Sequence, residues 1–271
     1  MEEVSFGTDG WRGVIADDYT YENLGRVAEA VASYLKSPDR EDLEIYDEWG
    51  TPYREANDGV VIGYDERFAY EDCALYVARV LMESGVPACV SETMVPTPAL
   101  AFAVRNMEAA AGIMITASHN PPEYNGFKVK IESGASAPPV VTDMIENSLP
   151  ENAPAIDRGV VVERADVTSN YVEAVADLVD EDKLTKNPVL AVIDSMYGSA
   201  QGITGEVLSK FDVPSVEVRG DFNPGFRGVR PEPLEEYLDP LKEEIANQRK
   251  KRENPIIGVV TDGDGDRVSA M

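Results

Sequence analysis

Positive charge, cysteine and long apolar runs are all scarce in this chain of 271 residues. Only 24 lysines and arginines accompany 50 aspartates and glutamates, so the formal net charge is -26. Nucleic acids and anionic membranes attract basic surfaces, so both are excluded as general partners. The acidic residues are spread along the whole chain. We interpret them as adaptation to high salt, where ions screen the repulsion; the alternative is simply a very soluble surface.

The two cysteines, Cys73 and Cys89, offer neither a disulfide framework nor the spacing of a metal site. Cys73 shares a helical face with Val77 and Leu81, which predicts a place in a core. No apolar run approaches the length that spans a membrane. The acidic first residues cannot form the basic start of a secretory signal, so we expect a cytoplasmic protein.

Patterns typical of strands and helices alternate along the chain, which predicts an α/β fold. At 43% hydrophobic residues, the chain can form substantial cores. Strands are expected at residues 59–64, 112–116, 188–194, 215–218 and 256–260. Helical periodicity is clear over residues 24–35, 172–179 and 234–245. Thr97 followed by Pro98 predicts a helix start with a capping hydroxyl.

Two segments interrupt this alternation. Residues 37–58 are acidic and contain proline and glycine, so we interpret them as an inserted surface loop. Residues 148–159 have the composition of a linker, which places the domain boundary there and gives domains 1–152 and 153–271. The final residues, 268–271, resemble the beginning of a strand, so we expect the second domain to be cut short.

Three carboxylates alternate with glycines in Asp-Gly-Asp-Gly-Asp-Arg at residues 262–267. The glycines permit a tight loop that turns the carboxylates toward one point. Mg²⁺ favours such oxygen ligands. An EF-hand is excluded, because a strand-like run precedes the loop and the twelfth position would fall beyond residue 271. Asp262, Asp264 and Asp266 are therefore candidate metal ligands; the alternative is a plain Asp-Gly turn.

A second polar turn, Thr-Ala-Ser-His-Asn-Pro, occupies residues 116–121 directly after a strand-like run. Ser118 lacks the Gly-x-Ser-x-Gly context of hydrolase nucleophiles, and the only histidine, His119, is adjacent and poorly placed as its base. Alone, such a serine is typical of a turn. Together, a hydroxyl that can carry phosphate and a carboxylate cluster that can hold Mg²⁺ are complementary parts of a phosphoryl-transfer site.

Basic residues accompany these loops. Lys128 and Lys130 share one face of a predicted strand, and we interpret them as a phosphate-facing patch and not as a solvated edge. Arg12 lies in Phe-Gly-Thr-Asp-Gly-Trp-Arg-Gly at residues 6–13, where glycines let backbone amides approach an anion. The sequence contains no P-loop or dinucleotide-binding glycine pattern, so neither ATP nor NAD is supported.

The motifs at residues 6–13, 116–121, 125–128 (Asn-Gly-Phe-Lys) and 262–267 resemble those of the α-D-phosphohexomutases. These are the phosphoglucomutases, phosphomannomutases and phosphoglucosamine mutases. The resemblance extends along the chain apart from residues 37–58. It implies a four-domain enzyme, of which this chain would hold two consecutive related α/β/α domains, with the third and fourth missing.

The resemblance also implies a role for each site residue. Ser118 would be the phosphoserine, and its phosphate would bind Mg²⁺ together with Asp262, Asp264 and Asp266. Lys128 would be a general acid/base, and the residues that assist would be His119, Arg12 and Arg267.

The function implied is interconversion of a hexose 1-phosphate and a hexose 6-phosphate through a bisphosphosugar. The motifs present do not distinguish glucose, mannose and glucosamine phosphates. One alternative is a non-catalytic, phosphorylated, Mg²⁺-binding remnant, or half of a split mutase whose missing domains lie on a separate chain. Another is a phosphatase-like hydrolase, which would release phosphate without isomerising the sugar.

Overall fold

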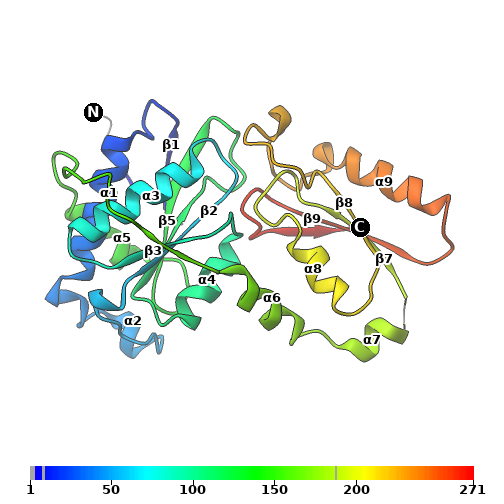
Figure 1. Ribbon diagram of the computed structural model, residues 1–271, viewed down its shortest axis with the longest axis horizontal. Coiled ribbons are helices and arrows are strands. Elements are labelled where there is room, and N and C mark those ends of the chain that lie inside the picture. The colour runs from blue at the N-terminus through cyan, green and yellow to red at the C-terminus, as the bar shows by residue number, and fades with distance from the viewer. Residues whose placement is uncertain (1–3, 8–9, 187) are drawn as a thin grey trace. The chain divides into compact units, whose positions relative to one another are not determined.

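The computed structural model describes residues 4–7, 10–186 and 188–271, and the chain divides into two compact units (Figure 1). Unit 1 consists of Met1–Tyr64, Ala69–Ala117 and Glu123–Val167. Unit 2 consists of Asp65–Phe68, Ser118–Pro122 and Thr168–Met271. Each unit is built on one β-sheet, so the α/β prediction is confirmed.

The sheet of unit 1 has six strands in the order β1-β5-β4-β2-β3-β6. Their bounds are β1 Trp11–Val14, β2 Val60–Tyr64, β3 Ala88–Ser91, β4 Ala111–Ile115, β5 Tyr124–Lys130 and β6 Glu163–Ala165. β4, β2, β3 and β6 run parallel, whereas β5 is antiparallel to both of its neighbours. The residues of β2 and β4 are all buried, as expected for central parallel strands made largely of apolar residues.

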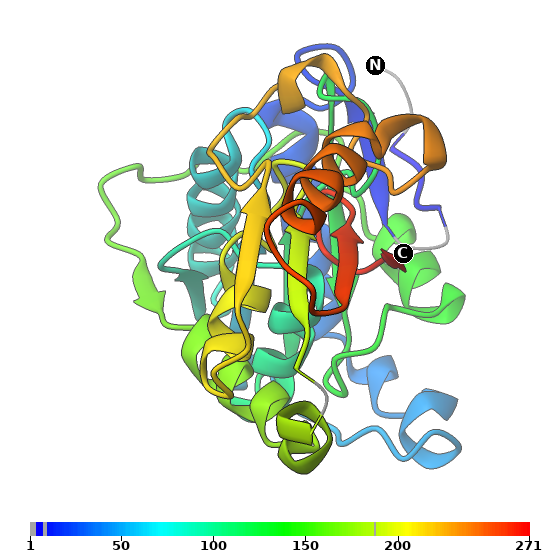
Figure 2. The same ribbon diagram turned by 90° about the vertical axis from the view of Figure 1, so that its right-hand side faces the viewer.

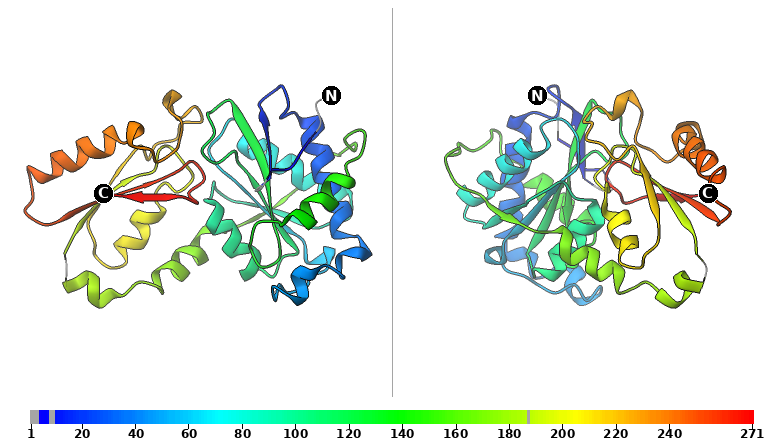
Figure 3. Two further views of the ribbon diagram at one scale, coloured as in Figure 1. Left: turned by 180° about the vertical axis from the view of Figure 1, so that it is seen from behind. Right: turned by 45° about the vertical axis from the view of Figure 1, so that its right-hand side comes forward.

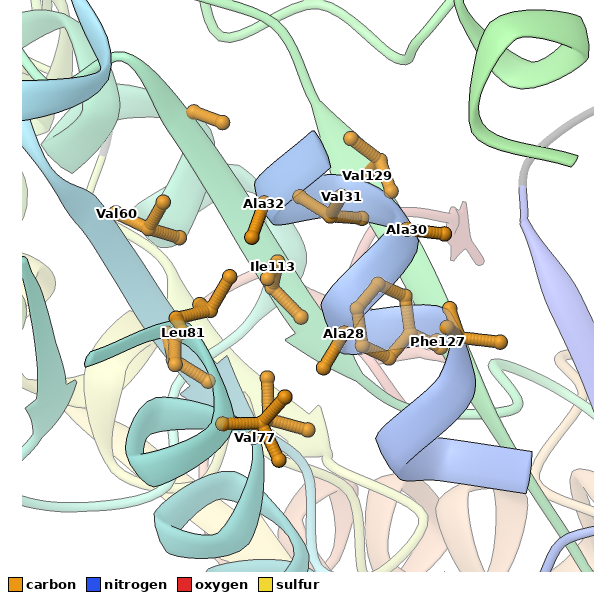
Figure 4. Packing of buried hydrophobic residues seen from close by; sticks show 14 of the residues in the cluster. Ala28, Ala30, Val31, Ala32, Val60, Val77, Leu81, Ile113, Phe127 and Val129 are labelled. Atoms are coloured by element: carbon orange, nitrogen blue, oxygen red, sulfur yellow. The ribbon is translucent and has the colours of Figure 1, made fainter. Parts of the chain in front are cut away.

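Helices cover both faces of this sheet. They are α1 Tyr21–Leu35, α3 Tyr70–Glu83, α4 Thr97–Asn106 and α5 Pro139–Asn147. Val31 of α1 and Leu81 of α3 pack with Ile113 and Phe127 of the sheet (Figure 4). On the other face, a Cβ at Gly112 would lie 2.4 Å from a methyl group of Val104 in α4. The glycine therefore allows α4 to pack closely.

Several local expectations for unit 1 are confirmed and others are corrected. Cys73 is buried in α3, as predicted. The cap of α4 is Pro96, one residue before the predicted Thr97, because the helix already begins at Thr97. Residues 148–159 contain no helix or strand, but unit 1 continues beyond them through β6 to Val167.

Residues 37–58, which the sequence predicts to be an inserted surface loop, contain regular secondary structure. They contain the short helices η1 (Pro38–Arg40), α2 (Glu44–Asp47) and η2 (Ala56–Asp58). Arg40 is fully buried and forms an ion pair with the buried Glu132. Removing one partner of a buried ion pair is strongly destabilising, so this contact anchors the acidic insertion to the body of unit 1.

The sheet of unit 2 has four strands in the order β10-β9-β7-β8. They are β7 Leu190–Asp194, β8 Ser215–Val218, β9 Ile256–Thr261 and β10 Val268–Ala270. β7, β8 and β9 are parallel and lie side by side in Figure 2, and β10 forms an antiparallel hairpin with β9. The predicted strands at 188–194, 215–218 and 256–260 are thus confirmed.

The helical elements of unit 2 are α6 Thr168–Ala176, α7 Glu181–Lys186, α8 Ile203–Ser209, η3 Phe226–Gly228, η4 Glu235–Tyr237 and α9 Asp239–Arg249. Figure 3 shows α8 and α9 on opposite faces of the sheet. Leu241 and Ile245 of α9 pack with Val192 of β7 and Val260 of β9. The helix predicted over 234–245 begins only at Asp239, with Pro240 in its first turn. Within the described part of the chain, none of the helices has the length and apolarity needed to cross a membrane.

Candidate active site

Ser118 follows β4 in a tight polar turn that belongs to unit 2. The residue is fully buried and has a φ of 53°, in the left-handed region that non-glycine residues seldom adopt. Its hydroxyl donates a hydrogen bond to Oδ2 of Asp262 at 3.0 Å. The side chain is therefore held in a fixed direction, which a solvated turn serine would not need.

The three aspartates of residues 262–267 form a cluster in the hairpin between β9 and β10. One carboxylate oxygen from each of Asp262, Asp264 and Asp266 lies within 4.8 Å of the others. Asp262 and Asp264 are fully buried, whereas Asp266 is exposed. Burial, followed by the negative charges of Asp264 and Asp266, raises the pKa of Asp262 to about 7.

A glycine brings the two loops together. A Cβ placed on Gly263 would lie only 2.6 Å from the carbonyl oxygen of Ser118 and 3.0 Å from a ring carbon of Pro231. Any larger residue would force these backbones apart. The backbone NH of Gly263 donates to the Pro231 carbonyl at 3.1 Å. The Gly263 carbonyl accepts a hydrogen bond from the NH of Ser199 at 2.9 Å. The aspartate loop is thus fixed on two sides.

His119 and Arg267 lie next to the two loops. Nδ1 of His119 is 3.4 Å from Oγ of Ser118, and the His119 carbonyl accepts a hydrogen bond from Nε of Arg230 at 3.0 Å. The backbone NH of Arg267 donates to Oδ1 of Asp262 at 3.1 Å. The Arg267 side chain is 46% exposed, so its guanidinium is accessible to a ligand.

Lys128 and Arg12 belong to unit 1. Lys128 lies on β5 and is almost fully buried; Arg12 lies on β1 and is half-buried. β5 is an interior strand of its sheet, and the Lys130 ammonium donates a hydrogen bond to Oγ of Ser136 at 2.8 Å. The phosphate-facing role of Lys128 and Lys130 stays a prediction. Thr8 and Asp9 of the Arg12 motif lie outside the described residues.

The sequence reasoning missed Asp65, Glu66 and Arg67, which follow β2 and belong to unit 2. All three side chains are fully buried. A signal was available. β2 and β4 are neighbouring parallel strands, so the polar residues that follow each strand emerge at the same edge of the sheet.

The residues present fit a hard divalent cation. An octahedral Mg²⁺ binds oxygen at about 2.1 Å, which separates opposite ligands by about 4.2 Å. The aspartate oxygens all lie within 4.8 Å of one another, which is compact enough for one cation to reach all three, and the Ser118 hydroxyl adds a further oxygen beside Asp262. The donor set contains oxygen alone, which suits Mg²⁺ better than softer metals.

The fold and the site together define an α/β protein that collects its polar groups in the loops following its sheet strands. Two family models match it in succession. Residues 3–155 match the phosphoglucomutase/phosphomannomutase α/β/α domain I, and residues 169–271 match domain II. The chain belongs to the phosphoglucomutase/phosphomannomutase family.

Known proteins support this membership along the whole chain. A protein of Pyrococcus abyssi named "Probable phosphoglucosamine mutase" is 31% identical over 271 residues, covering 98% of this chain and 53% of its own. The phosphomannomutase/phosphoglucomutase of Pseudomonas aeruginosa is 29% identical, covering 96% of this chain and 50% of its own.

A solved structure gives the same result. The crystal structure of a protein described as a phosphomannomutase from Thermus thermophilus is similar with a TM-score of 0.84 and 33% identity. The match covers 100% of this chain and 57% of that protein. The chain therefore spans about half the length of the curated relatives and of this structure.

Proposed function

We propose that the chain is the phosphoryl-carrying part of a phosphohexomutase, which interconverts a hexose 1-phosphate and a hexose 6-phosphate. The main support for this proposal is one hydrogen bond, from the Ser118 hydroxyl to Asp262 of the aspartate cluster. It joins a potential phosphate carrier to a set of cation ligands. The relatives' names support the substrate class, but they include three different sugars.

Ser118 exchanges phosphate with both ends of the sugar. In the first step, the bond between phosphorus and Ser118 Oγ breaks while a free hydroxyl oxygen of the hexose monophosphate bonds to phosphorus. Lys128 takes the hydroxyl proton in this proposal. The bisphosphosugar then reorients, and its other phosphate is transferred to Oγ. No water is consumed: the proton taken by Lys128 passes to Ser118 Oγ between the two transfers, and in the second transfer it moves to the sugar oxygen that is left.

The remaining site residues would bind either the cation or the phosphate. Asp262, Asp264 and Asp266, with Ser118, would bind Mg²⁺, which when bound neutralises charge on the phosphate being transferred. Arg267, His119 and Arg12 assist by binding phosphate oxygens; the exposed guanidinium of Arg267 supports this role. In the unphosphorylated protein, Asp262 accepts the hydrogen bond of the serine hydroxyl.

Transfer of labelled phosphate tests this role. The chain is mixed with Mg²⁺ and ³²P-labelled glucose 1,6-bisphosphate, and label on the protein is measured. We expect label on the unaltered chain and none on Ser118→Ala. The matched control is Ser209→Ala, an exposed serine of α8, which should label normally. Equal labelling of Ser118→Ala would reject the proposal.

Turnover by this chain alone should be very small. Remote contacts with a substrate can supply about 7–11 kcal/mol toward orienting the reacting groups, and this chain spans half the length of its relatives. The assay is conversion of glucose 1-phosphate to glucose 6-phosphate. Turnover that appears when a second chain with the remaining domains is added favours a split mutase. No turnover even then favours a remnant, whereas release of inorganic phosphate favours a hydrolase.

The setting that we propose is a salt-rich cytoplasm. The net charge of -26 supports it, because self-repulsion at this level is relieved by screening. The thermal midpoint should therefore rise between dilute buffer and molar KCl. An unchanged midpoint would contradict adaptation to salt.

A further inference from the structure

Arg67 contacts the Ser118 loop through several carbonyl oxygens. Its Nη2 donates to the carbonyls of Ser118 at 2.6 Å and Asn120 at 2.7 Å. Its Nη1 donates to the carbonyl of Pro121 at 2.7 Å. A guanidinium presents five donors in a rigid fork, so one side chain can bind three carbonyls of the same turn.

Arg67 is itself held in place. Nε donates to Oδ2 of Asp65 at 3.1 Å, and the guanidinium carbon lies 5.0 Å from the ring centre of Phe226. Both Asp65 and Arg67 are fully buried. The neighbouring Glu66 accepts hydrogen bonds from the Gln201 side chain and the Asn223 backbone. The Asp-Glu-Arg segment is therefore anchored independently of the turn that it contacts.

The turn requires such support. Ser118 has a positive φ, a backbone conformation that is strained for a non-glycine residue and persists only where its surroundings compensate. The Ser118 carbonyl is the atom that Gly263 approaches, and the same carbonyl accepts from Arg67. The group that fixes the serine backbone therefore also fixes its distance from the aspartate loop.

We infer that Arg67 is a positioning residue that holds Ser118 in the conformation needed for phosphoryl transfer. The residue acts through the backbone carbonyls and does not touch the reacting atoms in this assignment. The kinetic part of the inference rests on the proposed function of Ser118. The structural part, that Arg67 orders residues 118–121, does not.

The experiment has two readouts on the 271-residue chain. The first is the single-turnover rate of transfer from glucose 1,6-bisphosphate to Ser118, at concentrations that separate rate from affinity. Since misplacement by 1 Å can slow a reaction about 10²-fold, Arg67→Gln should lower the saturating rate by about that factor while Mg²⁺ affinity stays unchanged. Arg67→Lys keeps the charge but loses the fork, so it should recover only part of the rate.

The second readout is hydrogen exchange of the peptide containing residues 116–122. Arg67→Gln should speed exchange at least about 10-fold there, relative to peptides of the β7–β9 sheet. Arg249→Gln, an exposed arginine at the end of α9, is the control and should change neither readout. If Arg67→Gln fails to fold, Asp65→Asn tests the same network, because it keeps Arg67 but weakens what orients it. We expect a several-fold slower transfer for that variant.

The outcomes separate the two proposals. An unaltered chain that takes no phosphate, with exchange at residues 116–122 still dependent on Arg67, rejects the proposed function and leaves the ordering role standing. Transfer and exchange at unaltered levels in Arg67→Gln would overturn the inference. So would full recovery by Arg67→Lys, because charge alone would then be sufficient.

Discussion

The Ser118 loop and the aspartate loop hold their shapes by different means. The Ser118 loop has a strained residue, and a distant side chain, Arg67, binds its carbonyls. The aspartate loop is a hairpin closed by its own backbone, with Gly265 at a φ of 67° and Gly263 in close contact with Ser118. One loop depends on side-chain hydrogen bonds and the other on glycine, so different substitutions should damage them.

The largest effect is expected where the loops meet. Gly263→Ala would place a Cβ 2.6 Å from the Ser118 carbonyl, so the loops must separate. Phosphate transfer to Ser118 should fall by about 10²-fold, and unfolding should become easier by about 1–3 kcal/mol.

The matched control for that change is Gly205→Ala in α8. A Cβ there would have only ordinary contacts, the nearest at 3.6 Å. Alanine is favoured over glycine in a helix by about 1 kcal/mol, so this variant should be slightly more stable and equally active. Equal behaviour of the two alanine variants would contradict the close approach.

A smaller effect is expected when only the charge of the aspartate loop is changed. Asp264→Asn removes one negative charge from the cluster with little change in shape, so Mg²⁺ affinity should fall about 10-fold or more. Calorimetric titration measures it, and Asp177→Asn, an exposed position after α6, is the control. Unchanged affinity in Asp264→Asn would place the cation elsewhere.

The Asp-Glu-Arg segment that supports the Ser118 loop should respond to pH. Burial raises the pKa of Glu66 from 4.5 to about 7. The folded state therefore favours the protonated carboxyl. Its contribution to stability is fully present below pH 4.5 and is lost as the pH rises through about 7.

Glu66→Gln removes this titration. Relative to the unaltered chain, the variant should gain stability between about pH 4.5 and 7, by at most about 1.4 kcal/mol per pH unit. Denaturant unfolding with Mg²⁺ present measures the difference, since Asp262 also has a pKa of about 7 without a cation. A constant difference over this range would mean that Glu66 does not titrate there.

Sequence patterns predicted the parts of the fold that have strong periodicity. β2, β4, β7 and β9 are apolar runs, and the central helix α1 has a clear apolar face. Among the short strands that were not predicted, β6 (Glu163–Ala165) contains two charged residues and is ordered by pairing with β3. The burial of Lys128 and Lys130 was missed for a related reason, since strand alternation gives the face of a residue but not the position of its strand in the sheet.

The candidate site was also predicted only in part. The aspartate cluster and Ser118 could be found from local motifs, because each loop directly follows an apolar run. The hydrogen bond between them joins residues 144 positions apart in the sequence, and a local sequence pattern cannot predict a contact over that separation. The position of Arg67 directly after an apolar strand was a usable signal, but its partners are backbone carbonyls, which no sequence pattern identifies.

The most direct test of the account is the location of phosphate on protein purified from cells. Peptide mass spectrometry should find phosphate on Ser118, the buried serine that the aspartate loop contacts. The account predicts that the modified fraction falls to zero in Ser118→Ala without appearing at another serine. Phosphate found consistently on a different serine, with Ser118 unmodified, would contradict the claim that these two loops form a phosphoryl-transfer site.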